Sequence, residues 1–303
     1  MEISYLTYDQ IDKNKWDICI DHAPNGLIYA YSFYLDAMSK NWDALVLNDY
    51  EIVMPLTWNK KYGIHYLYQP PFTACLGIFG DQLSAQKINM FLNVIPSKFR
   101  YWDIYFNHGN FFNLTGFSLY ERMNYVLPLN TSYENLFNAY RENIRRNIKK
   151  SEQLQLIINK NIPVLDVINM AKEQANNFSD IDDGDFKRFE GLYQMLYQKE
   201  KSVTYGVFTK EGELLASAAF VFSHNRAYYI LVGNNPNGKT LGASHALINA
   251  FIKDHAGKNL ILDFEGSDIS SLAFFYSSFG TIEEKYSAIR LNKLPLPLRW
   301  FKK

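Results

Sequence analysis

The chain has 303 residues, and its 31 Lys and Arg balance its 31 Asp and Glu, so the formal charge is zero. A neutral chain lacks the cationic field of a general DNA or membrane-surface binder, so any site for a polyanion must be local. Hydrophobic residues make up 48% of the sequence, with 22 Tyr, 22 Phe and 5 Trp, which excludes a disordered chain and indicates two domains or one large one.

No segment approaches the roughly 18 apolar residues that span a bilayer, and the first residues lack the basic and apolar runs of a signal peptide. We therefore expect a cytoplasmic protein without membrane insertion. Cys19 and Cys75 are too few for a disulfide scaffold, and neither they nor the six His residues have the spacing of metal ligands. No metal site is predicted.

The first half of the chain alternates short helical and extended patterns. Apolar alternation predicts an antiparallel meander of three strands, with a helix before it and a helix and two strands after it. In chain order these elements are expected at 31–40, 43–48, 51–58, 62–69, 84–95, 100–107 and 119–129.

From Ser132 the apolar period becomes helical, because Leu136, Tyr140, Ile144 and Ile148 lie four residues apart. Two helices, three strands, a helix, a buried strand, a helix and strands to about 292 follow, at 163–178, 185–199, 202–209, 213–223, 226–233, 243–251, 260–262 and 270–279. Both halves share one plan. We predict an α/β (α+β) protein of two tandem domains, 1–132 and 133–303, each a mixed, largely antiparallel sheet flanked by helices.

The segment Gly233–Thr240 matches the phosphate-loop pattern G-x-x-x-x-G-K-[ST] between a predicted strand and a predicted helix. Backbone N–H groups at a helix N-terminus bind phosphate in such loops. Pro236 removes one donor, however, and the preceding strands are antiparallel, unlike the parallel sheet that such a loop requires. A P-loop-like nucleotide-binding protein is therefore the alternative, and not the preferred, function.

Residues 202–286 resemble the GNAT acyltransferase superfamily, in the tandem form of the FemAB-like peptidyltransferases. Residues 239–244, Lys-Thr-Leu-Gly-Ala-Ser, are similar to the Q/R-x-x-G-x-G/A turn of that family, with Lys for Gln/Arg and Ser for the second small residue. Residues 262–267, Leu-Asp-Phe-Glu-Gly-Ser, followed by the aromatic helix 273–280, are closer to its pattern. The resemblance implies a GNAT-like fold in both domains and acyl-CoA as co-substrate, with aminoacyl-tRNA as the alternative donor. The implied carrier-binding residues are Val232, Gly233, Gly238, Lys239, Thr240, Gly242, Ala243 and Ser244.

The expected reaction is acyl or aminoacyl transfer to a small amine or peptide acceptor. Glu265, just beyond a buried strand, is the candidate general base, and Asp263 is the substitute. Backbone N–H groups near Val232 and Gly233 would polarise the carbonyl. The resemblance implies that Tyr276 protonates the leaving group, whereas its aromatic neighbours are core residues.

Five cations lie between residues 141 and 150, opposed by Glu142 alone. They form either a solvated helix face or an anion site, and similar Arg-rich helices occur in the FemAB-like family. If the helix is an anion site, it could hold tRNA phosphates. Arg145, Arg146, Lys149 and Ser267 are the substrate-binding candidates. No DNA partner is expected.

Three further features are interpreted structurally. The acidic segment 180–185 fails the EF-hand spacing and is expected to cap a helix. Residues 242–246, Gly-Ala-Ser-His-Ala, imitate a nucleophile elbow but lack its last Gly, which disfavours a hydrolase. The resemblance implies that the apolar tail 294–298 returns to the first domain. A non-catalytic GNAT-like binding module remains an open alternative.

Overall fold

The computed structural model describes residues 2–114, 116–175, 181–266 and 268–295. The chain forms two compact units: unit 1 comprises residues 1–122 and those from Lys285 on, and unit 2 comprises residues 123–284. Unit 2 is thus one continuous stretch inserted into the chain of unit 1. The boundary predicted at 132–133 differs from this division, and the expected docking of the tail falls largely on residues 296–298, outside those described.

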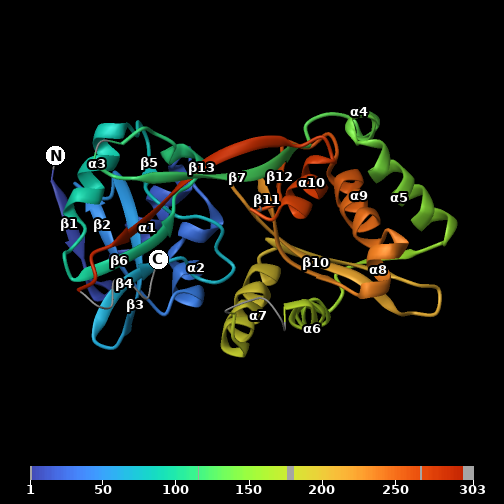
Figure 1. Ribbon diagram of the computed structural model, residues 1–303, viewed down its shortest axis with the longest axis horizontal. Coiled ribbons are helices and arrows are strands. Elements are labelled where there is room, and N and C mark those ends of the chain that lie inside the picture. Colours follow the sequence, from blue (N-terminus) through green and yellow to red (C-terminus); the bar gives the residue numbers. More distant parts are fainter. Residues whose placement is uncertain (1, 115, 176–180, 267, 296–303) are drawn as a thin grey trace. The chain divides into compact units, whose positions relative to one another are not determined.

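Unit 1 is a sheet with helices on both faces (Figure 1). Its strand order is β1 (Ile3–Leu6), β2 (Asn41–Leu47), β3 (Ile52–Lys61), β4 (Ile64–Tyr68), β6 (Phe99–Tyr105) and β13 (Ile282–Asn292), with β5 (Phe79–Gly80) paired to β3. The pair β4–β6 is parallel and the others are antiparallel. The helices are α1 (Lys13–His22), α2 (Ser32–Met38) and α3 (Ala85–Val94), with 3-10 turns at Tyr8–Gln10, Ile28–Ala30 and His108–Asn110.

The two faces of the unit 1 sheet follow from the alternation along β2. Leu45 and Leu47 point into a core that includes Phe91 of α3. The intervening side chains face the other way, where the ring of Trp42 packs on Trp16 of α1 with 5.1 Å between centroids. The alternation that predicts this strand therefore also directs its side chains to two faces, one toward α3 and the other toward α1.

The strands of unit 2 lie in the order β7 (Leu119–Pro128), β12 (Ile261–Asp263), β11 (Arg226–Asn234), β10 (Leu214–Ser223), β9 (Ser202–Phe208) and β8 (Ile157–Lys160). The pair β11–β12 is parallel and the others are antiparallel. One face carries α4 (Tyr133–Ala139), α5 (Glu142–Gln153), α8 (Pro236–Leu241), α9 (Ala243–His255) and α10 (Ser270–Ser277). The other carries α6 (Val164–Ala175) and α7 (Asp183–Gln198) (Figure 1).

The core of unit 2 forms where α9 crosses the sheet. The predicted apolar stripe of α9 is buried at Ala243, Ala246, Leu247 and Phe251. Phe251 stacks on Phe220 of β10 with 3.9 Å between ring centroids. This contact holds the second half of α9 against the sheet.

The predicted fold class is confirmed: both units are α/β, with largely antiparallel sheets flanked by helices. The continuous helix expected from Leu136 to Ile148 is wrong. It breaks at Tyr140 and Arg141, whose ψ angles are 141° and 155°. Arg141 N–H donates to Ser278 O at 2.9 Å instead of continuing the helix. Within the described residues, no helix combines the length and hydropathy needed to cross a bilayer.

Candidate active site

The parallel strands β11 and β12 separate partway along their length. They pair from Arg226 opposite Ile261 to Tyr228 opposite Asp263, where β12 ends. β11 continues to Asn234, and in the part of the chain that the structure describes this extension pairs with β10 alone. Its register shifts so that Ile230 has no directly opposed residue, which is a β-bulge. One edge of β11 therefore presents main-chain N–H and C=O groups where β12 has stopped.

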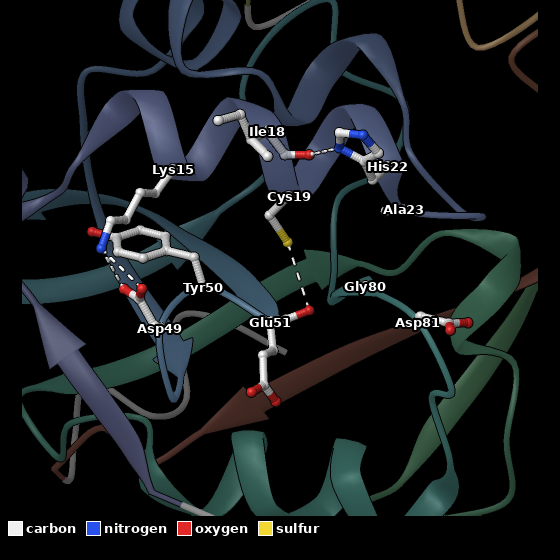
Figure 2. A pocket seen from close by; sticks show the side chains of 10 residues that line it. All are labelled: Lys15, Ile18, Cys19, His22, Ala23, Asp49, Tyr50, Glu51, Gly80 and Asp81. Atoms are coloured by element: carbon white, nitrogen blue, oxygen red, sulfur yellow. Dashed lines mark hydrogen bonds and ion pairs between the residues drawn. The ribbon is translucent and has the colours of Figure 1, made fainter.

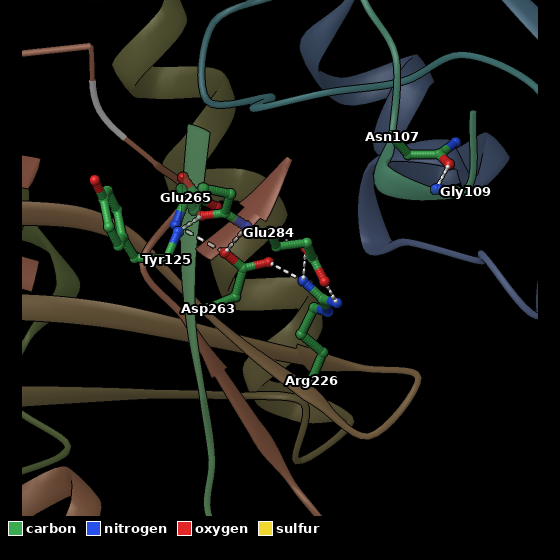
Figure 3. Close-up of polar contacts among 8 residues, drawn as sticks. Asn107, Gly109, Tyr125, Arg226, Asp263, Glu265 and Glu284 are labelled. Carbon is green, nitrogen blue, oxygen red and sulfur yellow. Dashed lines mark hydrogen bonds and ion pairs between the residues drawn. The ribbon is translucent and has the colours of Figure 1, made fainter. Parts of the chain in front are cut away.

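Glu265 lies in the turn that follows β12. Glu265 and Gly266 both have left-handed backbone, with φ of 61° and 72°. Asp263 Oδ1 accepts the Glu265 N–H at 2.8 Å, which closes an Asx-type turn (Figure 3). A Cβ at position 266 would lie 2.4 Å from Met123 O, so only glycine lets the turn pack this closely on β7. The carboxylate of Glu265 is thus carried at a fixed, half-buried position at the tip of β12.

Tyr276 of α10 lies beside this turn in a cluster of aromatic rings. Its ring centroid is 4.9 Å from that of Phe264 and 6.5 Å from that of Tyr125. Burial, and after it the negative charge of Glu265, raise the pKa of the Tyr276 phenol above its ordinary value. The structure therefore brings Glu265 and Tyr276 together, and it keeps the phenol protonated at neutral pH.

Asp263 is a member of a buried polar network that sequence reasoning missed. Its Oδ2 accepts from Arg226 Nη1 at 2.6 Å, and its Oδ1 accepts from Asn124 Nδ2 at 2.8 Å. Glu284 binds both Arg226 Nη atoms at 2.9 Å (Figure 3). Burial alone would lower the pKa of Arg226, but Asp263 and Glu284 outweigh it and raise the pKa. The sequence hints at this network only through Arg226, a charged residue at the start of the otherwise apolar strand β11.

The eight residues predicted to bind the carrier follow one another along β11, α8 and α9. Val232 and Gly233 belong to β11, Gly238, Lys239 and Thr240 to α8, and Ala243 and Ser244 to the first turn of α9. Gly242, with φ of 76°, forms the corner between the two helices. The resemblance thus located a strand-to-helix connection that the structure contains.

The predicted helix at 243–251 is present as α9, but the segment before it is a second, short helix that the sequence analysis treats as a loop. α8 starts at Pro236, which suits a first helical position, and Asn235 caps it by accepting Asn237 N–H at 2.9 Å. Gly238 is consequently inside a helix, where a Cβ would lie 2.2 Å from Leu215 O. The segment therefore forms a capped helix and not an open phosphate loop, which removes the structural basis of the nucleotide-binding alternative.

Other contacts hold the corner in place. A Cβ at Gly233 would lie 2.6 Å from Met170 Cγ of α6, and one at Gly242 would lie 2.7 Å from Asn147 O of α5. Lys150 Nζ donates to Thr240 O at 2.8 Å. The glycines at 233 and 242 therefore allow close packing, and α5 lies directly against the start of α9.

The cationic helix is α5, which buries Ile144 and Ile148 and exposes its predicted binding residues. Arg145 Nε donates to Tyr140 O at 3.1 Å, and Arg146 is 4.0 Å from the Glu142 carboxylate. Lys149 is exposed on the same helix. These cations thus project to solvent from the helix that packs against the corner at Gly242. Ser267 lies outside the described residues.

The predicted helix cap in the acidic segment is confirmed, although Asp180 itself is not described. Asp182 and Asp185 form a reciprocal capping box at the start of α7. No group of metal-ligating side chains is found among the residues that the structure describes.

Unit 1 contains a cavity of about 350 Å³ lined in part by Cys19 (Figure 2). Burial raises the pKa of that thiol to about 11, so it is not a nucleophile at neutral pH.

No family model and no curated protein matches the chain. Among solved structures, FemX is similar over 100% of both chains, with a TM-score of 0.66 and 13% identity. L-PGS from Bacillus licheniformis is similar over 96% of this chain and 95% of its own, with a TM-score of 0.56 and 11% identity. A domain from Agrobacterium fabrum described as the C-terminal domain of a lysylphosphatidylglycerol synthetase covers 96% and 94%, with a TM-score of 0.56 and 8% identity. The predicted resemblance is confirmed at the level of the fold: this chain has the fold of FemX.

Proposed function

We propose that the protein is an acyltransferase that moves an acyl or aminoacyl group from a carrier to an amine acceptor. The observation that carries the proposal is the open edge of β11 beyond Tyr228, with Glu265 at the tip of β12 and the buried phenol of Tyr276 beside it. The fold shared with FemX supports it. So does the likeness to a domain named for lysylphosphatidylglycerol synthesis, the attachment of an aminoacyl group.

The three groups account for the proton movements of acyl transfer. The attacking amine must lose a proton, which Glu265 accepts directly or through water. Main-chain N–H groups on the free edge of β11, near Val232 and Gly233, stabilise the negative charge that develops on the carbonyl oxygen. Tyr276 remains protonated at neutral pH and donates its proton to the leaving group as the bond to the carrier breaks.

The carrier is acyl-CoA in the first instance, with aminoacyl-tRNA as the alternative. Both are rich in phosphate, and the residues present fit such a group. α9 is a 13-residue helix, and its start at Gly242 is the positive end of the helix dipole. The exposed cations Arg145, Arg146 and Lys149 lie on the helix beside them.

Binding measurements at two salt concentrations separate the carriers. We would titrate coenzyme A, acetyl-CoA, aminoacyl-tRNA and uncharged tRNA into the wild type and into a variant with Arg145, Arg146 and Lys149 changed to Gln. If tRNA is the carrier, the triple variant binds it more weakly, and the slope of log K against log salt falls by about two to three. A control variant with the exposed Lys187, Lys201 and Lys210 changed to Gln loses the same charge elsewhere in unit 2 and keeps its affinity.

Turnover with the carrier that binds tests the chemistry. Glu265→Gln and Tyr276→Phe are each expected to lower kcat by about 100-fold or more, because each removes a proton-transfer group. Circular dichroism and the unfolding midpoint check that the fold is kept. If both folded variants turn over at the wild-type rate, the assignment of these residues is wrong. A wild type that binds the carrier without turnover indicates the binding-module alternative.

A further inference from the structure

Three buried residues and the half-buried Glu284 form one hydrogen-bonded cluster, which we call the Arg226 network; the buried members are Asn124, Arg226 and Asp263. We propose that this network is a positioning device for Glu265. It fixes the turn that carries the carboxylate, and it joins β11 to β12 just before the two strands separate. The assignment rests on the proposed function, since it concerns how that reaction's base is held. None of the four residues is expected to touch the acceptor.

Asp263 connects the network to the turn through its two oxygens. Oδ2 faces inward and accepts from Arg226 Nη1 at 2.6 Å, whereas Oδ1 accepts the main-chain N–H of Glu265 at 2.8 Å. Asn124 Nδ2 also donates to Oδ1 at 2.8 Å, so the carboxylate cannot rotate without breaking a bond on either side. The rotamer of Asp263, and with it the backbone of Glu265, is therefore set from β7 and β11.

The turn needs such support because its backbone is unfavourable. Glu265 is not glycine, yet its φ is 61°, a region that side chains with a Cβ avoid. Residues held in such conformations persist where the surroundings over-determine them, and they gather at functional sites. Here the surroundings are the hydrogen bond that Glu265 N–H donates to Asp263 and the packing of Gly266 on Met123.

The network also lies at the last point where the two parallel strands are joined. Asp263 is opposite Tyr228, the final pair of the β11–β12 register, and Arg226 is two residues earlier on β11. The Arg226–Asp263 ion pair thus bridges the strands just before they separate, with side-chain exposures of only 8% and 7%. A guanidinium facing two carboxylates in the interior is a poor way to gain stability compared with apolar packing. It does, however, give a single fixed geometry.

The test compares two substitutions of Asp263 with a matched control. Asp263→Ala removes the acceptor for Glu265 N–H, whereas Asp263→Asn keeps an Oδ1 acceptor and gives up the charge. Asp185→Ala is the control, because Asp185 is likewise a buried aspartate of unit 2 that accepts a main-chain N–H, from Asp182 at 2.9 Å, and pairs with an arginine. Amide hydrogen exchange of Glu265, measured by NMR, reports on the turn without any assay of turnover.

We expect the Glu265 amide to exchange about tenfold faster or more in Asp263→Ala than in the wild type, with most of the protection restored in Asp263→Asn and kept in Asp185→Ala. In the turnover assay, Asp263→Ala should lower kcat by about tenfold with KM unchanged, and Asp263→Asn should recover part of it. An unchanged Glu265 amide in Asp263→Ala, or an equal response in Asp185→Ala, overturns the positioning role. If the Glu265 amide exchanges faster in Asp263→Ala but the wild type turns over no carrier, the proposed function is wrong, and the network still holds the turn.

Discussion

His245 shows how burial changes the chemistry of one side chain. It lies in the first turn of α9, with its ring 5.0 Å from that of Phe275, and its Nδ1 has no hydrogen-bond partner among the described residues. Burial lowers the pKa of His245 to about 4. An imidazole with so low a pKa is neutral in the folded protein over the whole range in which an unfolded histidine becomes charged.

The consequence is a pH dependence of stability with a definite sign. Between about pH 6.5 and 4 the unfolded chain takes up a proton at residue 245 and the folded chain does not, so the stability that is present above pH 6.5 is lost as the pH falls. We expect His245→Leu to make the urea unfolding midpoint less sensitive to pH between 7 and 5. Part of the slope should persist, because burial also lowers the pKa of His255 to about 4.

The exposed His22 supplies the comparison for this measurement. His22→Leu should leave the slope of the unfolding midpoint against pH as it is in the wild type. An equal slope in wild type and His245→Leu would contradict the role given to His245.

Residues of the candidate site could be predicted where the signal is local in sequence. Glu265 and Tyr276 were identified because a strand, a Gly-containing turn and an aromatic helix follow one another within 20 residues. The Arg226 network could not be found in this way. Its hydrogen-bonded partners are 37, 58 and 139 residues apart, and a single charge in an apolar strand does not say which carboxylate it meets.

At the scale of elements, the corner between α8 and α9 depends on Gly242. Its φ of 76° disfavours any residue with a Cβ, and that atom would also lie 2.7 Å from Asn147 O of α5. Gly257 has a similar φ of 81° but nothing within 4 Å. The two positions share the conformational cost of a substitution and differ in the steric one.

We therefore expect Gly257→Ala to lower the free energy of unfolding by about 1–2 kcal/mol, the cost of left-handed backbone. Gly242→Ala should lower it by about 1–3 kcal/mol more, because α5 must move to admit the new carbon. Chemical denaturation of both variants measures the difference. Equal losses at the two positions would show that α5 yields without cost and that the corner is not tightly packed.

The helices and strands that the apolar period predicts lie close to their observed ranges. The sequence analysis does not predict β1, α1 or β5, and it misses three further features. The break at Tyr140 lies inside an unbroken stripe of apolar residues, and it results from the hydrogen bond of Arg141 to Ser278, far along the chain. The edge strand β8 has four exposed residues and so shows no alternation. α8 is six residues long and looked like a loop because of its Asn, Pro and Gly. In each case distant contacts or short length removed the local signal.

For the molecule as a whole, the path of the chain matters more than the composition of either unit. Unit 1 obtains its last strand from the far end of the sequence, where Ala288–Asn292 pair with Tyr101–Tyr105 of β6. Ala288 and Ile289 are buried there. The strands β7 and β13 carry the chain into and out of unit 2.

A truncation after Lys285 removes that pairing and leaves unit 2 entire. We expect peptides from β2 and β3 to exchange their amide hydrogens much faster in the truncated protein, while peptides from β9 and β10 stay protected. Hydrogen exchange followed by mass spectrometry distinguishes the two units in one sample. A truncation after Lys293 keeps β13 and should leave both units protected. Equal protection of unit 1 in the two truncated proteins would show that β13 is dispensable.

The same chain path sets an order of events during translation. Residues 123–284 emerge from the ribosome before the strand that completes the sheet of unit 1 does. The second half of the protein can therefore finish folding first, while the earlier-synthesised half waits with the edge of β6 uncovered. The protein should consequently expose an aggregation-prone N-terminal half until β13 has left the ribosome, and during that interval it depends on chaperones.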